Sequence, residues 1–196
     1  MAERPTERIA LFGGSFDPVH VGHLFVAEEV RIRLGYDRVI FVPAAEAPHK
    51  NGPPAGSASD RLAMLELAIE HDAFSIGRWE IDRGGVSYTV DTVRRVIADG
   101  LAVGKPGLII GDDLVSGFSS WREPEELISL ADVIVVRRDS IPLPQLLREA
   151  HTVDNAVLPV SSSQIRERVH SGNAFRYLVS EPVYRYIVDH GLYLRS

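Results

Sequence analysis

The 196-residue sequence contains no cysteine. That absence excludes disulfide bridges, thiolate zinc sites, iron–sulfur clusters and cysteine nucleophiles together. Long apolar runs are missing too, because no stretch approaches the roughly 18 residues that a membrane-spanning helix needs. The first residues also lack the apolar segment of a signal peptide. We therefore expect a soluble cytoplasmic protein with no membrane partner.

Positively charged residues are also fewer than negatively charged ones. The sequence has 21 Lys and Arg against 27 Asp and Glu, a formal net charge of −6. This balance argues against a nucleic-acid partner, because such proteins neutralise phosphates over an extended basic surface. Apolar residues make up 45% and charged residues 24%, close to the average of soluble globular proteins. We therefore expect a packed domain in which a local cationic pocket would bind any phosphate.

Strand and helix patterns alternate along the chain. Short apolar runs predict buried strands at residues 9–12, 39–42, 108–110 and 133–136, with weaker strand patterns at 74–81 and 156–158. Helical spacing predicts a first helix that has Asp17 as its N-cap, Pro18 in its first turn and Gly35 at its end. Further helices are predicted at residues 60–71, 92–98, 124–130, 143–150, 162–169 and 183–190.

This alternation predicts the fold class: a doubly wound, mostly parallel open α/β sheet, with a small helical C-terminal part. One domain over residues 1–196 is expected, with a core at about 7–160 and the helical part at about 161–196. The sequence leaves the oligomeric state open, with a homo-oligomer among the alternatives. Residues 44–59 form an unusually long Ala-, Pro-, Gly- and Ser-rich loop, of the kind that is usually functional or disordered.

The turn after the first strand, residues 13–23, reads GGSFDPVHVGH. Ligands of open α/β sheets bind at the carboxyl ends of the strands, where this turn lies. Its glycines let the backbone approach a phosphate, and the helix start offers N–H groups and partial positive charge. His20 and His23 are three residues apart, so both imidazoles can point at one anion. Ordinary surface or core histidines, a plain glycine turn and a metal site are the alternatives.

A second segment, SSSQIR at residues 161–166, opens a late helix. Its serines can cap the helix and donate hydrogen bonds to phosphate oxygens, and Arg166 adds a cationic fork. The alternative is an ordinary N-cap followed by a solvated arginine.

Together these two segments resemble the ordered signatures of the HxGH nucleotidyltransferase superfamily. The residues between them are similar to bacterial nicotinate-mononucleotide adenylyltransferases: PHK at 48–50, SYTVDT at 87–92, GDD at 111–113 and Trp121. Arg138 stands where that family has the arginine of an RPG turn, although Asp139 and Ser140 replace Pro and Gly here. Residues 186–193 resemble the closing helix of the family.

The resemblance implies an enzyme of NAD biosynthesis that transfers AMP from ATP to nicotinate mononucleotide, giving deamido-NAD and pyrophosphate by direct in-line attack. Mg²⁺ would arrive with ATP, without a protein metal site. The implied catalytic residues are His20, His23, Lys50 and Arg166. The implied ATP-binding residues are Gly13, Gly14, Ser15, Phe16, His20, Gly22, His23, Gly111, Asp112, Ser161, Ser162, Ser163 and Arg166. The implied mononucleotide-binding residues are Ser15, Lys50, Tyr88, Thr89, Asp112, Trp121 and Arg138.

Plainer roles remain open for several of these residues: Thr89 and Thr92 as cap residues, Asp112 as a turn residue and Trp121 as a packing aromatic. At the level of function, the alternatives are another HxGH adenylyltransferase, acting on phosphopantetheine, and a non-catalytic nucleotide-binding module. The SYTVDT segment and Trp121 argue against the first, and the intact signature residues argue against the second.

Overall fold

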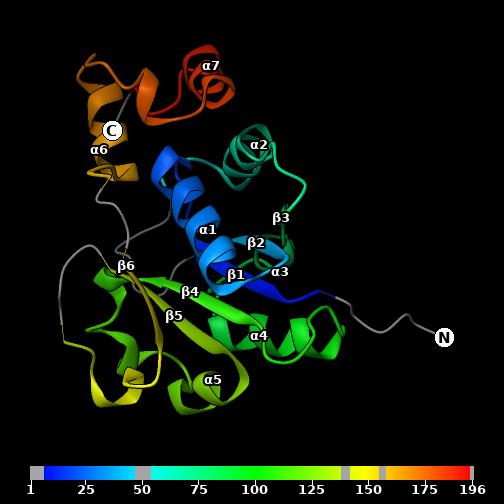
Figure 1. Ribbon diagram of the computed structural model, residues 1–196. Coiled ribbons are helices and arrows are strands. Elements are labelled where there is room, and N and C mark those ends of the chain that lie inside the picture. Colours follow the sequence, from blue (N-terminus) through cyan, green and yellow to red (C-terminus); the bar gives the residue numbers. More distant parts are fainter. Residues whose placement is uncertain (1–6, 47–53, 138–141, 155–157, 195–196) are drawn as a thin grey trace.

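The computed structural model describes residues 7–46, 54–137, 142–154 and 158–194. Its centre is a six-stranded sheet with the order β3-β2-β1-β4-β5-β6 (Figure 1). The strands are β1 (Ile9–Gly14), β2 (Arg38–Pro43), β3 (Phe74–Ile76), β4 (Gly107–Gly111), β5 (Asp132–Arg137) and β6 (His151–Asp154). Every neighbouring pair is parallel. The prediction of a doubly wound, mostly parallel open sheet is confirmed.

The order of the strands reverses beside β1. The chain runs outward from β1 to β2 and β3, then returns to pair β4 with the other side of β1. Leu11 of β1 lies opposite Leu108 of β4, so the two strands end at the same edge of the sheet. Such a reversal leaves a crevice between the loops that leave the two strands, and ligands bind there in doubly wound folds.

Alternation along the strands sends side chains to two cores. Ala10 and Phe12 of β1 pack into one cluster, whereas Ile9 and Leu11 pack into the other. The same alternation continues along β2, β4 and β5, because successive side chains of a strand point to opposite faces. Both faces of these strands are therefore buried, which is why the strands appear in the sequence as continuous apolar runs.

The helices form a layer on each face of the sheet (Figure 1). Residues of α1 (Val21–Leu34), α2 (Ala58–Ala68), α6 (Ser162–His170) and α7 (Glu181–Asp189) join the first core. Residues of α4 (Thr89–Ala98) and α5 (Pro124–Leu130) join the second. The predicted helical C-terminal part thus packs as α6 and α7 over the α1 and α2 side. None of the helices in the described part of the chain has the length and apolar character to span a bilayer.

Two segments were assigned the wrong secondary structure. Residues 74–81 form the short edge strand β3 followed by the helix α3 (Trp79–Arg83), because the ladder to β2 ends where the N–H of Gly77 donates to the carbonyl of Phe41. Residues 143–150 form only a 3₁₀ turn at Gln145–Leu147, since Pro144 delays its start and β6 begins at His151.

The last strand was predicted at residues 156–158, whereas the described strand β6 spans His151–Asp154. Residues 155–157 lie outside the described residues, and Leu158 is not in a strand. Strand β6 was not predicted from the sequence. It lies at an edge of the sheet, and Val153 alone among its four residues is buried. A strand with so few apolar residues carries little period-two signal.

Candidate active site

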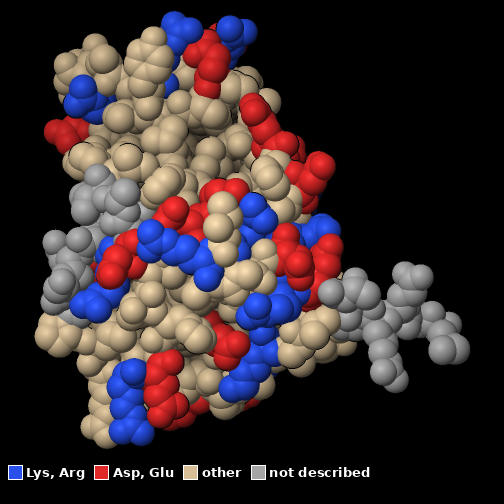
Figure 2. Space-filling view, viewed as in Figure 1, with Lys and Arg blue, Asp and Glu red and all other residues tan. Residues whose placement is uncertain are grey.

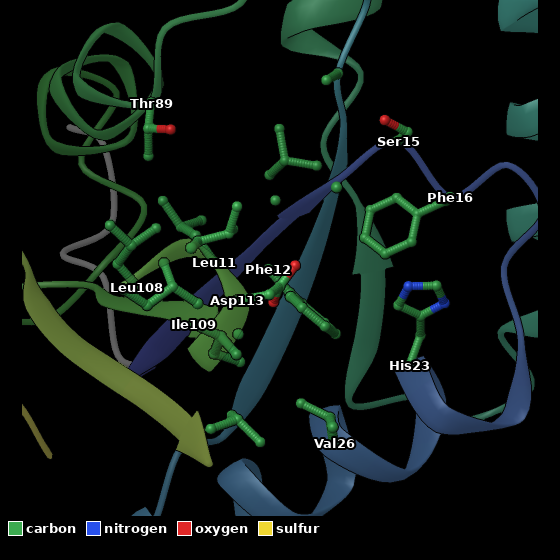
Figure 3. Close-up of a pocket in the computed structure, with 18 of the residues that line it drawn as sticks. Leu11, Phe12, Ser15, Phe16, His23, Val26, Thr89, Leu108, Ile109 and Asp113 are labelled. Atoms are coloured by element: carbon green, nitrogen blue, oxygen red, sulfur yellow. The ribbon is translucent and has the colours of Figure 1, made fainter. Parts of the chain in front are cut away.

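A cavity of about 620 Å³ opens at the carboxyl ends of β1 and β4. Apolar side chains of these strands, among them Leu11, Phe12, Leu108 and Ile109, line its middle (Figure 3). We call the side formed by residues 13–23 and the start of α6 the histidine end. We call the side formed by Glu80, Ser87, Tyr88, Thr89, Thr92, Trp121 and Arg122 the α4 end. His23 and Thr89 mark the opposite sides of the cavity in Figure 3.

The histidine end is built around the start of α1. His20 is the N-cap of this helix, and its backbone N–H donates to Nδ1 of His23 over 3.2 Å. An accepting Nδ1 leaves the proton of a neutral His23 on Nε2, where it can be donated to an anion. The two rings stack with centroids 3.6 Å apart. The spacing of three residues therefore brings both imidazoles to one place, and both line the cavity.

Gly22, between the two histidines, lies in a closely packed position. A Cβ at this position would lie 3.0 Å from Cγ1 of Val160 and 3.1 Å from Nδ1 of His20. Phe16, at a φ of 49°, places its ring edge-on to the His23 ring, with centroids 5.0 Å apart. The imidazole pair is thus held between a tightly packed glycine and a buried aromatic ring.

Asp17 was predicted to cap the first helix, and this prediction was wrong. The helix begins at Val21, and the buried carboxylate of Asp17 faces another part of the chain. It accepts hydrogen bonds from the N–H groups of Ala55 (2.8 Å) and Gly56 (3.0 Å) and from the hydroxyl of Tyr193 (2.7 Å). Burial and the Asp17 carboxylate raise the pKa of Tyr193, so its hydroxyl remains a donor. Asp17 therefore joins the turn at residues 13–23 to the start of α2 and to the C-terminal segment.

The three serines and Arg166 surround the same turn from the side of α6. Ser161 is the N-cap of this helix and accepts from the N–H of Gln164, and the hydroxyl of Ser162 donates to the carbonyl of Pro18 over 2.9 Å. The guanidinium of Arg166 donates to the carbonyl of Asp17 over 2.6 Å and to the hydroxyl of Ser163 over 3.1 Å. Of this segment, Ser162 lines the cavity. Arg166 instead supports the backbone of the turn.

Arg61 was missed by sequence reasoning. It is 1% exposed, and its guanidinium donates to the carbonyls of Ser15 (2.9 Å) and Ala44 (2.7 Å). It therefore links the segments that leave β1 and β2 at the site edge of the sheet. In the sequence this arginine is one polar position in an amphipathic helix, and such residues are usually solvated, so no local signal marks it.

The α4 end presents the beginning of a helix to the cavity. Tyr88 is the N-cap of α4 and Thr89 its first residue, and both line the cavity. The guanidinium of Arg122 lies over the ring of Tyr88, 4.7 Å from its centroid. Trp121 lines the cavity while one side of its ring contacts Phe118, with centroids 5.0 Å apart. It therefore both packs and offers an aromatic surface.

Some predicted site residues lie elsewhere. Asp112 is buried in a 3₁₀ turn (Asp112–Leu114), whereas its neighbours Gly111 and Asp113 line the cavity. Lys50, with the rest of the PHK segment, and Arg138 lie outside the described residues. Their assignments stay predictions. Glu80, Arg122 and Asp113 line the cavity without having been predicted.

Comparison with known proteins identifies the family. The sequence matches the cytidylyltransferase-like family over residues 11–168. It is 39% identical over 190 residues to the probable nicotinate-nucleotide adenylyltransferase of Borreliella burgdorferi, covering 96% of this chain and 98% of that protein. The chain belongs to the nicotinate-nucleotide adenylyltransferase family. The prediction of an adenylyltransferase of NAD biosynthesis is confirmed, and with it the assignment as an enzyme.

A second relative agrees with this assignment, and a solved structure agrees with the fold. The protein of the same description from Symbiobacterium thermophilum is 38% identical over 201 residues, with 96% of each chain covered. A structure of the nicotinic acid mononucleotide adenylyltransferase of Plasmodium falciparum, complexed with NaAD, has a TM-score of 0.78 at 18% identity, and covers 97% of this chain and 98% of that chain. At that identity the likeness supports the fold.

The charges of this family member are dispersed over its surface. Figure 2 shows positive and negative side chains interleaved on one face. Arg94 illustrates the pattern, since it forms ion pairs with Asp91, Glu123 and Glu126. The described residues nowhere gather three or more His, Asp or Glu side chains that could hold a metal ion.

Proposed function

We propose that this adenylyltransferase binds the phosphates of ATP at the histidine end and the pyridine ring of nicotinate mononucleotide at the α4 end. The observation that carries the proposal is one continuous cavity at the strand-order reversal, with stacked imidazoles on one side and a helix start beside a tryptophan on the other. A dinucleotide product would span such a cavity, with its two phosphates at the histidine end and its pyridine ring at the α4 end.

At the histidine end, the donors suit phosphate oxygens. The start of α1 offers backbone N–H groups and a partial positive charge, and Nε2 of His23 offers a proton. We assign phosphate binding to Gly13, Gly14, Ser15, His20, Gly22, His23 and Ser162, which line the cavity. Lys50 stays a proposed phosphate ligand from its motif. Arg166 and the serines at 161 and 163 would act by holding the turn, through the bonds to Asp17 and within α6.

The reaction we propose is a direct displacement. An oxygen of the mononucleotide phosphate forms a bond to the α-phosphorus of ATP, while the bond from that phosphorus to the bridging oxygen of the β-phosphate breaks. Pyrophosphate leaves with the electron pair. The nucleophile is already an anion at neutral pH, so no general base is needed, and catalysis consists of positioning and stabilising charge.

At the α4 end, the proposed ligand is the pyridine ring and its carboxylate. Trp121 would stack on the ring, since its indole lines the cavity. The first N–H groups of a helix lack partners within the helix, so the start of α4 at Tyr88 and Thr89 can donate to the carboxylate. A carboxylate accepts hydrogen bonds only, whereas a carboxamide would set its NH₂ against these donors. The helix start therefore favours nicotinate over nicotinamide. Asp112 and Arg138 stay proposed mononucleotide ligands by resemblance alone.

Mg²⁺ is proposed to enter with ATP. Mg²⁺ prefers octahedral oxygen ligands and often keeps several waters beside substrate phosphates. The carboxylates of Asp113 and Glu80 line the cavity, but the described residues form no three-ligand cluster around either. The residues thus fit an ion held by the triphosphate and water, and do not fit a metal site built by the protein. When bound, the ion would neutralise phosphate charge.

The experiment that tests the function is pyrophosphate release from Mg-ATP with nicotinate mononucleotide, nicotinamide mononucleotide or phosphopantetheine. We expect the highest kcat/KM with nicotinate mononucleotide. Equal or faster release with phosphopantetheine, or no release with any of the three, would contradict the proposal.

The direct displacement has its own test. An ATP analogue with a chiral α-thiophosphate should give product with inverted configuration at that phosphorus, because one in-line step inverts once. Net retention would require two displacements and a covalent nucleotidyl-enzyme.

A further inference from the structure

Glu80 is a buried carboxyl group that the proposed reaction does not use. It lies on α3, is 6% exposed, and lines the α4 end of the cavity. Removing a carboxyl group from water is costly, and buried carboxyl groups persist where hydrogen bonds compensate for the loss of hydration. A fold that needed only packing at this position would be served by an apolar side chain.

The side chain of Glu80 interacts with residues of the segment that forms the α4 end. The hydroxyl of Thr92 donates to Oε1 of Glu80 over 2.5 Å, and Thr92 belongs to the first turns of α4. The side chain of Ser87 also favours the charged form of Glu80 and lowers its pKa. Ser87 and Thr92 are buried, so neither contact is weakened by competing water.

Ser87 also connects the α4 end to the chain that follows β2. Its hydroxyl accepts from the N–H of Ala45 over 3.1 Å, and its own N–H donates to the carbonyl of Glu46 over 2.9 Å. Residues Tyr88 and Thr89, which we assign to the pyridine carboxylate, stand between these two anchored points. Their backbone position is therefore determined by the carboxyl group of Glu80 on one side and by the β2 segment on the other.

The electrostatic setting agrees with this geometry. Burial raises the pKa of Glu80, and the hydrogen bonds from Thr92 and Ser87 oppose that rise. Arg83 on the same helix lowers the pKa, whereas Asp91 on α4 raises it. The hydroxyl donors are thus the groups that make a carboxyl group tolerable here, and each of them is attached to the substrate-binding segment.

We propose that Glu80 is a positioning residue for the nicotinate half of the site, holding the start of α4 so that its N–H groups face the substrate carboxylate. The inference rests on the proposed function. It requires that loss of Glu80 impairs the mononucleotide and spares ATP, whose phosphates bind at the other end of the cavity.

The test compares Glu80→Ala with Glu80→Gln, by KM for each substrate and by calorimetric binding of nicotinate mononucleotide. We expect Glu80→Ala to raise KM and Kd for nicotinate mononucleotide about tenfold, as befits a lost buried hydrogen-bond partner, with KM for ATP unchanged. Glu80→Gln can still accept from Thr92, and its NH₂ can donate to Ser87, so it should restore most of the binding. Asp82→Ala is the matched control, since Asp82 is an exposed carboxylate on the same helix whose ion-pair partner is Arg78.

Thr92→Val provides a second variant that leaves Glu80 in place and serves if Glu80→Ala does not fold. It should also raise KM for nicotinate mononucleotide selectively. An equal rise for both substrates, or no change in either variant, would overturn the positioning role. Measurements on the parental enzyme distinguish a failure of the positioning role from a failure of the proposed function. If it neither binds nor turns over nicotinate mononucleotide, both proposals fall, whereas normal turnover with unaffected variants overturns the role of Glu80 alone.

Discussion

The two ends of the cavity are held by different kinds of bonds. The histidine end is a short stretch of chain around which distant segments gather: Asp17 receives donors from Ala55, Gly56 and Tyr193, and Arg166 donates to its carbonyl. The α4 end is held by the bond between Glu80 and Thr92, which are 12 residues apart in the sequence, and by the bonds of Ser87 to the chain that follows β2. We propose that the reacting phosphates of both substrates bind at the histidine end and that the α4 end selects the mononucleotide.

This difference predicts which variants change turnover and which change substrate specificity. In the proposed binding mode, groups at the histidine end surround the phosphates, where charge develops during the reaction. Groups at the α4 end would contact a part of the substrate that does not react. A change at the first end should therefore alter turnover, and a change at the second should alter substrate preference.

The largest expected effect follows from removing an imidazole. His23→Ala should lower kcat by about 10²–10³, the usual loss when one preorganised donor to a reacting group is removed. His20→Ala should behave similarly, because the two rings are stacked. The measurement is turnover together with thermal melting. His170→Ala, an exposed histidine in the last turn of α6, is the control and should change neither. A variant at position 20 or 23 with parental turnover and a native melting curve would make that histidine a bystander.

The next effect tests substrate preference at the α4 end. Thr89 is the first residue of α4, where proline is tolerated, and Tyr88 before it has φ −109° and ψ 124°, which suits a residue preceding proline. Thr89→Pro therefore removes one N–H with little disturbance of the helix. We expect the preference for nicotinate over nicotinamide mononucleotide to fall about tenfold to a hundredfold in kcat/KM.

Thr89→Ala keeps the N–H and serves as the matched control. Trp121→Ala sharpens the result further, because an aromatic surface serves both pyridine rings alike. It should raise both KM values and leave their ratio intact. A preference that survives Thr89→Pro would move carboxylate recognition away from this helix start.

A smaller effect is expected for the C-terminal connection of the histidine end. Tyr193→Phe removes one of the donors to Asp17, while the N–H groups of Ala55 and Gly56 remain. We expect the free energy of unfolding to fall by about 1.5 kcal/mol, the lower range for a hydrogen bond to a charged group, with a modest fall in kcat. Chemical denaturation measures it. Tyr177→Phe is the control, because Tyr177 is 89% exposed. Equal stability of the two variants would show that the connection is dispensable.

The smallest effect is a pH dependence of stability at the other end. Burial raises the pKa of Glu80 from its ordinary value of 4.5. The stability that protonated Glu80 contributes is complete below that ordinary value and is lost as pH rises through the raised folded-state pKa. Each unit of elevation corresponds to about 1.4 kcal/mol. The free energy of unfolding of Glu80→Gln, relative to the parental protein, should therefore increase as pH rises from 4.5. A difference that is independent of pH would contradict a raised pKa.

The fold and the two ends of the site differ in how far the sequence could predict them. The alternating apolar runs and helical spacings predicted the doubly wound sheet, because the residue pattern that specifies each strand or helix lies within a few neighbouring residues. The turn with His20 and His23 was found for the same reason. Glu80, Arg61 and Arg122 were missed. Each is an ordinary polar residue in its local context, and only the folded chain gives it a partner.

By itself, then, the sequence determined most of the strands and helices, the family and the turn that holds His20 and His23, because periodicity, glycine placement and helix-end chemistry act over a few residues. The tertiary structure alone decided that Asp17 binds the C-terminal segment instead of capping α1, that Asp113 instead of Asp112 lines the cavity, and that Glu80 is buried beneath the start of α4. These outcomes depend on hydrogen bonds between segments as far as 176 residues apart. Such partners become neighbours only when the sheet brings the carboxyl ends of its strands together.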